Sequence, residues 1–132
     1  MEYQKKKAGI MKLIDTDIFI DFFRGVPEAA TFLQEHVQDI IFSAITEAEL
    51  LSGQVCNDVQ EKEKVFHLLS QFEKIAVDNL LVQVAGDIRR KYGLEIPDAI
   101  IAASAFVSDS VLITRNINHF EKVKEIKVKK PY

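Results

Sequence analysis

The chain has 132 residues and a net charge of −3, and 48% of its residues are hydrophobic. This length suits one globular domain, and the composition excludes a disordered chain. Proteins that bind nucleic acid through a general positive electrostatic field usually carry an excess of basic residues, whereas the net charge of this chain is negative. The longest apolar run, residues 99–107, is far shorter than the roughly 20 residues that cross a bilayer.

These features predict a cytoplasmic protein with no membrane partner. The first residues lack the apolar stretch of a secretory signal, and the lone Cys56 cannot form an internal disulfide. We expect a single domain over residues 11–132. Residues 1–10 are predicted to be a poorly ordered extension, with Met11 as an alternative start.

Apolar runs and amphipathic stretches alternate along the chain, and each type of pattern predicts one type of element. In chain order they predict a strand at 12–15, helices at 18–23 and 28–37, a strand at 39–42, a helix from Ser43 or Thr46 to 51, a helix at 58–70, a strand at 72–77, helices at 79–92 and 97–108, a strand at 111–114 and an edge strand at 126–128. This alternation is typical of an α/β fold. We predict a short, mainly parallel central sheet of four to five strands, covered by helices on both faces.

Acidic and amide side chains follow several of the predicted strands. Asp15 and Asp17 come after the first strand, Glu49 lies in the helix after the second, and Asn116 follows the fourth. In open α/β sheets, ligands bind beyond the carboxyl ends of the strands, so we expect these side chains to share one crevice.

Asp98 lies in the first turn of a helix that is apolar on every side from residue 99 to 107, except at Ser104. Such a helix is normally buried, so we expect its first turn to be buried too. A buried carboxylate there needs a cation or donor groups. The alternative is that the amide groups and dipole of its own helix satisfy Asp98.

Helix capping offers simpler explanations for some of these residues. Thr46 and Glu49 match a capping box, and Asp17 or Thr16 can cap a helix, whereas Asp15 has no such explanation. Asp21, four residues after Asp17, is either a supporting residue beside the site or solvated surface, and we favour surface. The three histidines, which are scattered and suggest no zinc site, are interpreted as surface or structural residues: His36, His67 and His119. Carboxylates gathered from distant segments favour Mg²⁺ or Mn²⁺.

Four motifs in order resemble PIN-domain toxins of the VapC type. They are Leu13-Ile14-Asp15-Thr16-Asp17-Ile18-Phe19-Ile20-Asp21 with Arg24-Gly25, residues 43–53, Pro97-Asp98-Ala99-Ile100-Ile101-Ala102, and Leu112-Ile113-Thr114-Arg115-Asn116. The resemblance covers residues 11 to about 120. It implies that Asp15, Glu49 and Asp98 are catalytic acids that hold the metal, with Thr16 and Asp17 close by. Asn116 stands where many PIN nucleases carry a fourth acid, and its carbonyl oxygen is a further candidate ligand.

The resemblance also implies an activity and its partners. The expected protein is a Mg²⁺- or Mn²⁺-dependent endoribonuclease, the toxin of a toxin–antitoxin pair, which forms a homodimer and binds a small antitoxin. Metal-activated water would attack an RNA phosphodiester, Asp17 or Asp98 would accept a proton, and the substrate contacts would be Thr16, Thr114 and Arg115. Two alternatives stay open: a non-catalytic PIN-like module that binds RNA or protein, and an aspartyl-phosphate phosphatase with Asp15 as nucleophile.

Overall fold

Five short parallel strands form the centre of the computed structural model, which describes residues 10–132. They are β1 (Lys12–Ile14), β2 (Ile40–Ser43), β3 (Glu73–Ile75), β4 (Val111–Ile113) and β5 (Lys127–Lys129). The strand order is β3-β2-β1-β4-β5, and every neighbouring pair is parallel. The predicted parallel sheet is confirmed. The predicted extension falls on residues that lie outside the described part of the chain, except for Ile10.

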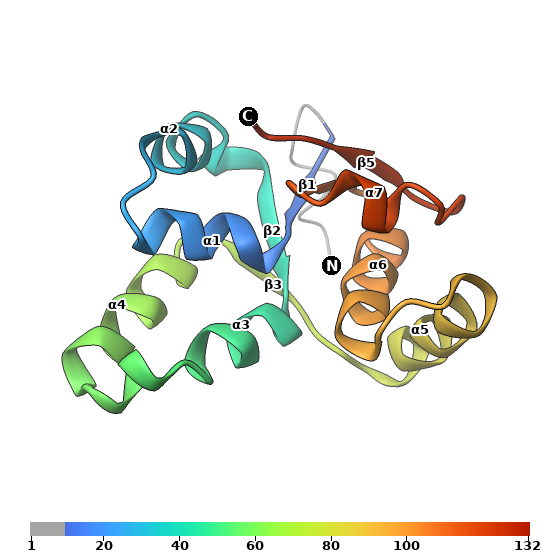
Figure 1. Cartoon of the computed structure of the whole chain (residues 1–132), viewed down its shortest axis with the longest axis horizontal. Helices are drawn as coiled ribbons and strands as arrows, with labels where there is room; N and C mark the ends of the chain where they lie inside the picture. The colour runs from blue at the N-terminus through green and yellow to red at the C-terminus, as the bar shows by residue number, and fades with distance from the viewer. Residues whose placement is uncertain (1–9) are drawn as a thin grey trace.

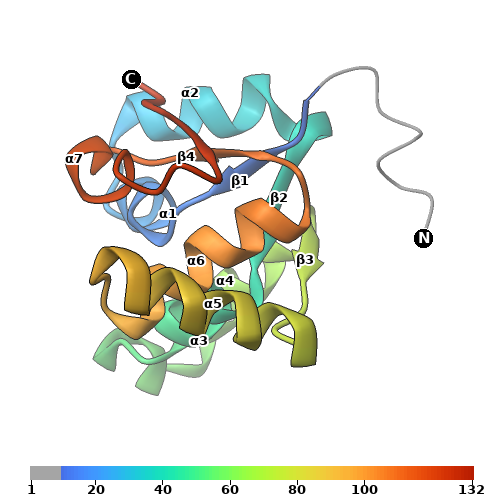
Figure 2. The same cartoon turned by 90° about the vertical axis from the view of Figure 1, so that its right-hand side faces the viewer.

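Helices cover both faces of the sheet, as predicted (Figures 1 and 2). The described residues form α1 (Thr16–Phe23), α2 (Pro27–Glu35), α3 (Ala44–Leu51), α4 (Val59–Leu69), α5 (Asn79–Tyr92), α6 (Ile96–Val107) and α7 (Ile117–Phe120), with single 3₁₀ turns at Val37–Asp39 and Gln54–Asn57. None of the helices in residues 10–132 has the length and apolar character needed to span a membrane.

Successive residues of the central strands enter two separate cores because side chains alternate across a sheet. Leu13, Ile41 and Leu112 pack with apolar residues of α5 and α6 on one face. Ile14 and Ile113 pack on the other face with residues of α1, α2 and α4. The two cores fix the sheet between its helices, so the carboxyl ends of the strands are held rigidly.

One expectation about α6 is wrong: its ends are not buried. Ile96 is 49% exposed and Phe106 is 46% exposed, and the Asp98 side chain is 31% exposed. Only the middle of α6 is enclosed, since α5 and the sheet cover its small residues there. Asp98 therefore faces partly into solvent, where a ligand can reach it.

Gly93 ends α5 in a left-handed conformation, with φ +76, and an added Cβ would meet no atom within 4 Å. We expect Gly93→Ala to destabilise the fold by about 1 kcal/mol, because alanine, unlike glycine, is strained in this left-handed backbone conformation. Gly86→Ala is the matched control: Gly86 lies inside the same helix with the same open space, so alanine should stabilise by about 0.5 kcal/mol or more. Urea unfolding measures both, and shifts of the same sign would contradict the backbone explanation.

Candidate active site

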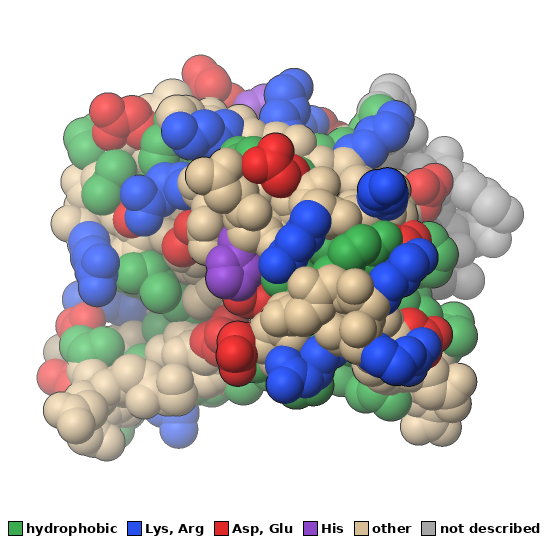
Figure 3. All heavy atoms as spheres, turned by 45° about the vertical axis from the view of Figure 1, so that its right-hand side comes forward, with side chains coloured by type: hydrophobic (Ala, Val, Ile, Leu, Met, Phe, Trp, Pro, Cys, Tyr) green, Lys and Arg blue, Asp and Glu red, His purple; other side chains and the backbone are tan. Residues whose placement is uncertain are grey.

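The sequence-predicted acids lie around the carboxyl ends of the central strands. Asp15 directly follows β1, Thr114 directly follows β4, α3 follows β2, and Asp98 lies in the first turn of α6. On the side of the molecule that carries α5, α6 and α7, acidic and histidine side chains lie next to each other with basic side chains around them (Figure 3). The topology therefore brings segments from four parts of the chain to one edge of the sheet.

Asp15 is 7% exposed and is held by two donors. Its Oδ1 accepts the backbone N–H of Thr16 at 2.8 Å, and its Oδ2 accepts the Thr114 hydroxyl at 2.8 Å. Asp15 is the N-cap of α1, so the interpretation that it has no capping role is wrong. Burial, together with the neighbouring charges of Asp17 and Asp98, raises the pKa of Asp15 to about 7 against the opposing effect of these hydrogen bonds.

Asp17 lies in the first turn of α1 and leaves one oxygen without a partner. Its Oδ1 is buried and accepts no hydrogen bond from any described residue. Burial raises the pKa of Asp17, and the charge and backbone N–H of Arg115 oppose that shift. A buried carboxylate oxygen without a donor is costly unless another group, such as a cation, satisfies it.

Asp98 is paired with a residue that the sequence argument set aside. Its Oδ2 lies 2.9 Å from His119 Nε2. Asp98 is also close enough to Asp15 for its charge to raise the pKa of that residue. The signal that could have identified His119 was its position three residues after Asn116, in a segment that returns to the same edge of the sheet.

Glu49 belongs to the same group of side chains through Thr16. Its Oε1 accepts the Thr16 hydroxyl at 2.6 Å, and the hydroxyls of Thr16 and Thr46 are 2.9 Å apart. The capping-box explanation of Glu49 is wrong, because α3 begins at residue 44 and its N-cap is Ser43, which accepts the N–H of Ile45. Thr16 is 7% exposed, and its hydroxyl contacts Glu49 and Thr46, while its expected contact with a substrate stays a prediction.

Three residues directly follow β4, and each makes different contacts. Thr114 is fully buried and donates to Asp15, while its hydroxyl also accepts the N–H of Asn116 at 2.9 Å. It therefore supports Asp15, and its expected contact with a substrate stays a prediction. Asn116 is exposed and makes no capping hydrogen bond through its side chain. Arg115 is 47% exposed in its side chain and forms an ion pair with Asp21.

The donor set fits a hard divalent cation. Asp15, Asp17 and Asp98 offer carboxylate oxygens, one oxygen of Asp17 has no partner, and the charges of Asp17 and Asp98 both raise the pKa of Asp15. In residues 10–132, no three acidic, histidine or cysteine side chains converge into a ready-made metal cage. Mg²⁺ does not require one, since it usually binds one or two carboxylates and keeps several waters.

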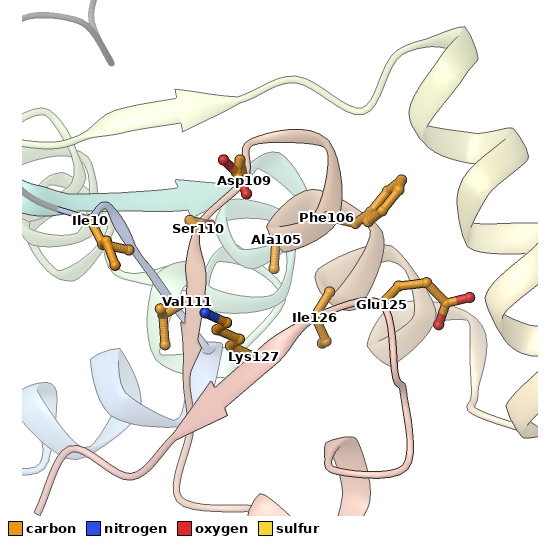
Figure 4. A pocket seen from close by; sticks show the side chains of 9 residues that line it. All are labelled: Ile10, Ala105, Phe106, Asp109, Ser110, Val111, Glu125, Ile126 and Lys127. Atoms are coloured by element: carbon orange, nitrogen blue, oxygen red, sulfur yellow. The ribbon is translucent and has the colours of Figure 1, made fainter.

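A cavity of about 330 Å³ at the opposite end of β4 and β5 is separate from these acids (Figure 4). Its lining has five apolar residues and four polar or charged ones: Ile10, Ala105, Phe106, Asp109, Ser110, Val111, Glu125, Ile126 and Lys127. Asp109 and Glu125 are its only carboxylates. The cavity lies at the amino ends of the strands, so it does not share the site described above.

The fold is a parallel α/β sheet, and acidic side chains lie at the carboxyl ends of its strands, where ligands bind in this class of protein. The chain belongs to the PIN domain family, whose model matches residues 12–126. It is 35% identical over 118 residues to ribonuclease VapC19 of Mycobacterium tuberculosis, covering 83% of this chain and 92% of that protein. It is 31% identical to ribonuclease VapC1 of Methanocaldococcus jannaschii, covering 96% and 89% of the two chains.

Solved structures show the same fold. A toxin-antitoxin complex from Klebsiella pneumoniae has a chain that matches with a TM-score of 0.80 at 31% identity, covering 92% of this chain and 98% of that one. A chain of VapBC2 from Rickettsia felis, bound to a DNA fragment from its promoter, matches with the same TM-score at 22% identity and the same coverage. At that lower identity the likeness concerns the fold alone.

Proposed function

We propose that this chain is a divalent-metal-dependent endoribonuclease that hydrolyses RNA phosphodiester bonds as the toxin of a toxin–antitoxin pair. The observation that carries the proposal is the unpartnered, buried oxygen of Asp17, a residue whose charge adds to burial in raising the pKa of Asp15. The relatives named as ribonucleases, at 31% and 35% identity over most of both chains, support RNA as the substrate class. The cytoplasm, where RNA is made and used, is part of the same proposal.

Asp15 and Asp98 are the residues that would hold Mg²⁺ or Mn²⁺, with Asp17, Glu49 and Asn116 as further oxygen donors. A cation bound there would act as a Lewis acid, activating water and offsetting the charge of the phosphate. Mg²⁺ and Mn²⁺ both prefer the carboxylate and carbonyl oxygens that these residues supply.

The chain's own residues prepare the site for hydrolysis. Thr114 and the N–H of Thr16 fix both oxygens of Asp15, so its direction is set before a ligand arrives. Asp17 or the partly exposed Asp98 would accept a proton from the attacking water. The Thr16 hydroxyl fixes Glu49 in the same way. The catalytic acids are therefore Asp15, Asp17, Glu49 and Asp98.

Metal removal tests this proposal directly. The purified chain should cleave labelled RNA with Mn²⁺ or Mg²⁺ and stop when EDTA is added. Intact RNA under all conditions would favour the non-catalytic PIN-like module, for which the exposed Asn116 in place of an acid is the supporting observation. Hydrolysis of a phosphate monoester in place of RNA would favour the phosphatase.

Thr114→Val should lower the cleavage rate about 10-fold, as the loss of a residue that orients a metal ligand typically does. The Thr114 hydroxyl lowers the pKa of Asp15, so its removal should raise that pKa further and leave less carboxylate for the cation. Thr114→Ser keeps the hydroxyl and should retain most activity. Equal rates for the valine and serine variants in initial-rate assays would contradict this role.

We also propose a small antitoxin as partner and a homodimer as the assembly. A groove of about 450 Å³ runs from Glu49 between α1, α3 and α4. Phe23 and Val55 line it and are exposed, so a protein segment that covers them would also reach the edge of the site. The Klebsiella pneumoniae chain that resembles this one comes from a toxin-antitoxin complex, which supports the same kind of partner.

A further inference from the structure

A buried carboxylate next to the acidic site has no role in the hydrolysis described above. Asp21 lies one helical turn after Asp17 in α1 and is 6% exposed, although the sequence suggested a surface position. Its Oδ2 lies 2.9 Å from Arg115 Nε and accepts the Tyr132 hydroxyl at 2.6 Å. Asp21, Arg115 and Tyr132, which we call the Asp21 cluster, join α1 to the segment after β4 and to the segment after β5.

The Asp21 cluster contributes little net stability to the fold. Taking a carboxylate and a guanidinium out of water costs free energy that their attraction often only balances. The Arg115 side chain, however, is 47% exposed while its partner is buried. A guanidinium carries five N–H donors, so one held through Nε by Asp21 still has donors for a second acceptor.

The backbone of Arg115 shows where that second acceptor would lie. The charge and backbone N–H of Arg115 act to lower the pKa of Asp17, and the residue before it, Thr114, donates to Asp15. Arg115 is therefore fixed beside the two acids, with the direction of its side chain set by Asp21. A planar guanidinium that is held in one orientation can donate hydrogen bonds to a phosphate oxygen.

We propose that Arg115 contacts an RNA phosphate at this site and that Asp21 and Tyr132 are positioning residues that hold its guanidinium in place. The inference rests on the proposed ribonuclease function and adds two residues to it. Without Asp21, the arginine would keep its charge and lose its fixed direction.

The charge of Asp21 makes the test decisive, because two explanations predict opposite signs. A carboxylate that only contributes negative charge repels RNA, so Asp21→Asn would tighten binding. A carboxylate that positions Arg115 helps binding, so the same substitution would weaken it. Tyr132→Phe removes a donor from Asp21 without changing any charge.

The experiment measures RNA binding separately from cleavage. All variants are made in the Asp15→Asn background and titrated with fluorescein-labelled single-stranded RNA of randomised sequence at several salt concentrations. Arg115→Gln should weaken binding about 10-fold and reduce the slope of log K against log salt by about 0.7, the value for one phosphate contact on a single strand. Asp21→Asn and Tyr132→Phe should weaken binding about 3- to 10-fold with the slope unchanged.

An exposed ion pair in α5 provides matched controls. Arg90 and Asp87 lie 2.8 Å apart with side chains 75% and 69% exposed, and Arg90→Gln and Asp87→Asn should change affinity far less than the cluster variants. Unchanged or tighter binding by Asp21→Asn, with thermal unfolding showing a folded chain, would overturn the positioning role. If the wild-type chain neither binds nor cleaves RNA, the proposed function itself fails.

Discussion

Asp15→Asn should abolish RNA cleavage while the chain stays folded and, at neutral pH, gains stability. Losing even an indirect partner of a metal ligand costs about 10- to 100-fold, so losing the central ligand should cost more than about 100-fold. Asparagine keeps the shape of the side chain and can still cap α1 by accepting the N–H of Thr16. It also removes a negative charge that burial and two neighbouring acids disfavour.

Initial rates with labelled RNA and Mn²⁺ measure the first effect, and urea unfolding without metal measures the second. Asp87→Asn is the control. It removes an exposed carboxylate from α5, and the resulting chain has the same net charge as the Asp15→Asn variant. Its cleavage rate and stability should stay close to those of the wild-type chain. If Asp15→Asn cleaves as fast as Asp87→Asn, Asp15 is not part of the active site.

The fold could be predicted from short-range patterns because each element has a distinct one. Buried strands such as β4 are apolar runs, and the helical period of apolar residues in α5 continues up to Gly93, where the helix ends. A four-residue helix such as α7 is too short to show a period, so it was not predicted. The end of β1 was placed one residue too late, because an N-cap and the last residue of a strand both have extended backbones.

That one-residue difference changes the interpretation of the site. Once Asp15 caps α1, Thr16 and Asp17 lie in the helix, and Thr16 can reach Glu49 in α3. The sequence motifs identified which acids gather at the sheet edge, but they could not show which hydroxyl each acid accepts. Those partners depend on packing between elements.

Contacts between distant residues could not be predicted from sequence patterns. Tyr132 and Asp21 are 111 positions apart, and Asp98 meets His119 only because α7 returns to the start of α6. Asp21 sits at a helical spacing that suits a surface residue as well as a buried one. Its burial follows from the two segments that cross over α1, which no local pattern indicates.

The stability of the metal-free chain should fall as pH rises between the ordinary pKa of an aspartate, 3.8, and the raised value of about 7 for Asp15. In this window the folded chain holds a proton that the unfolded chain has released, so folding is favoured less and less as the pH increases. The loss from Asp15 alone is at most about 4 kcal/mol, since each pKa unit corresponds to about 1.4 kcal/mol. Asp15→Asn removes this contribution, so the difference between the two unfolding curves reports Asp15 together with its effect on the neighbouring Asp17.

A divalent cation should reverse the trend, because it binds the carboxylate that the proton otherwise occupies. At about pH 8, Mn²⁺ at 100 times its Kd should add about 2.7 kcal/mol of stability, and at about pH 5 competition with the proton should make the gain much smaller. Unfolding of the wild-type and Asp15→Asn chains with EDTA or Mn²⁺ at both pH values measures the coupling. An equal Mn²⁺ gain in both chains would place the cation away from Asp15, and a gain that shrinks as pH rises would contradict competition between proton and metal for the same oxygens.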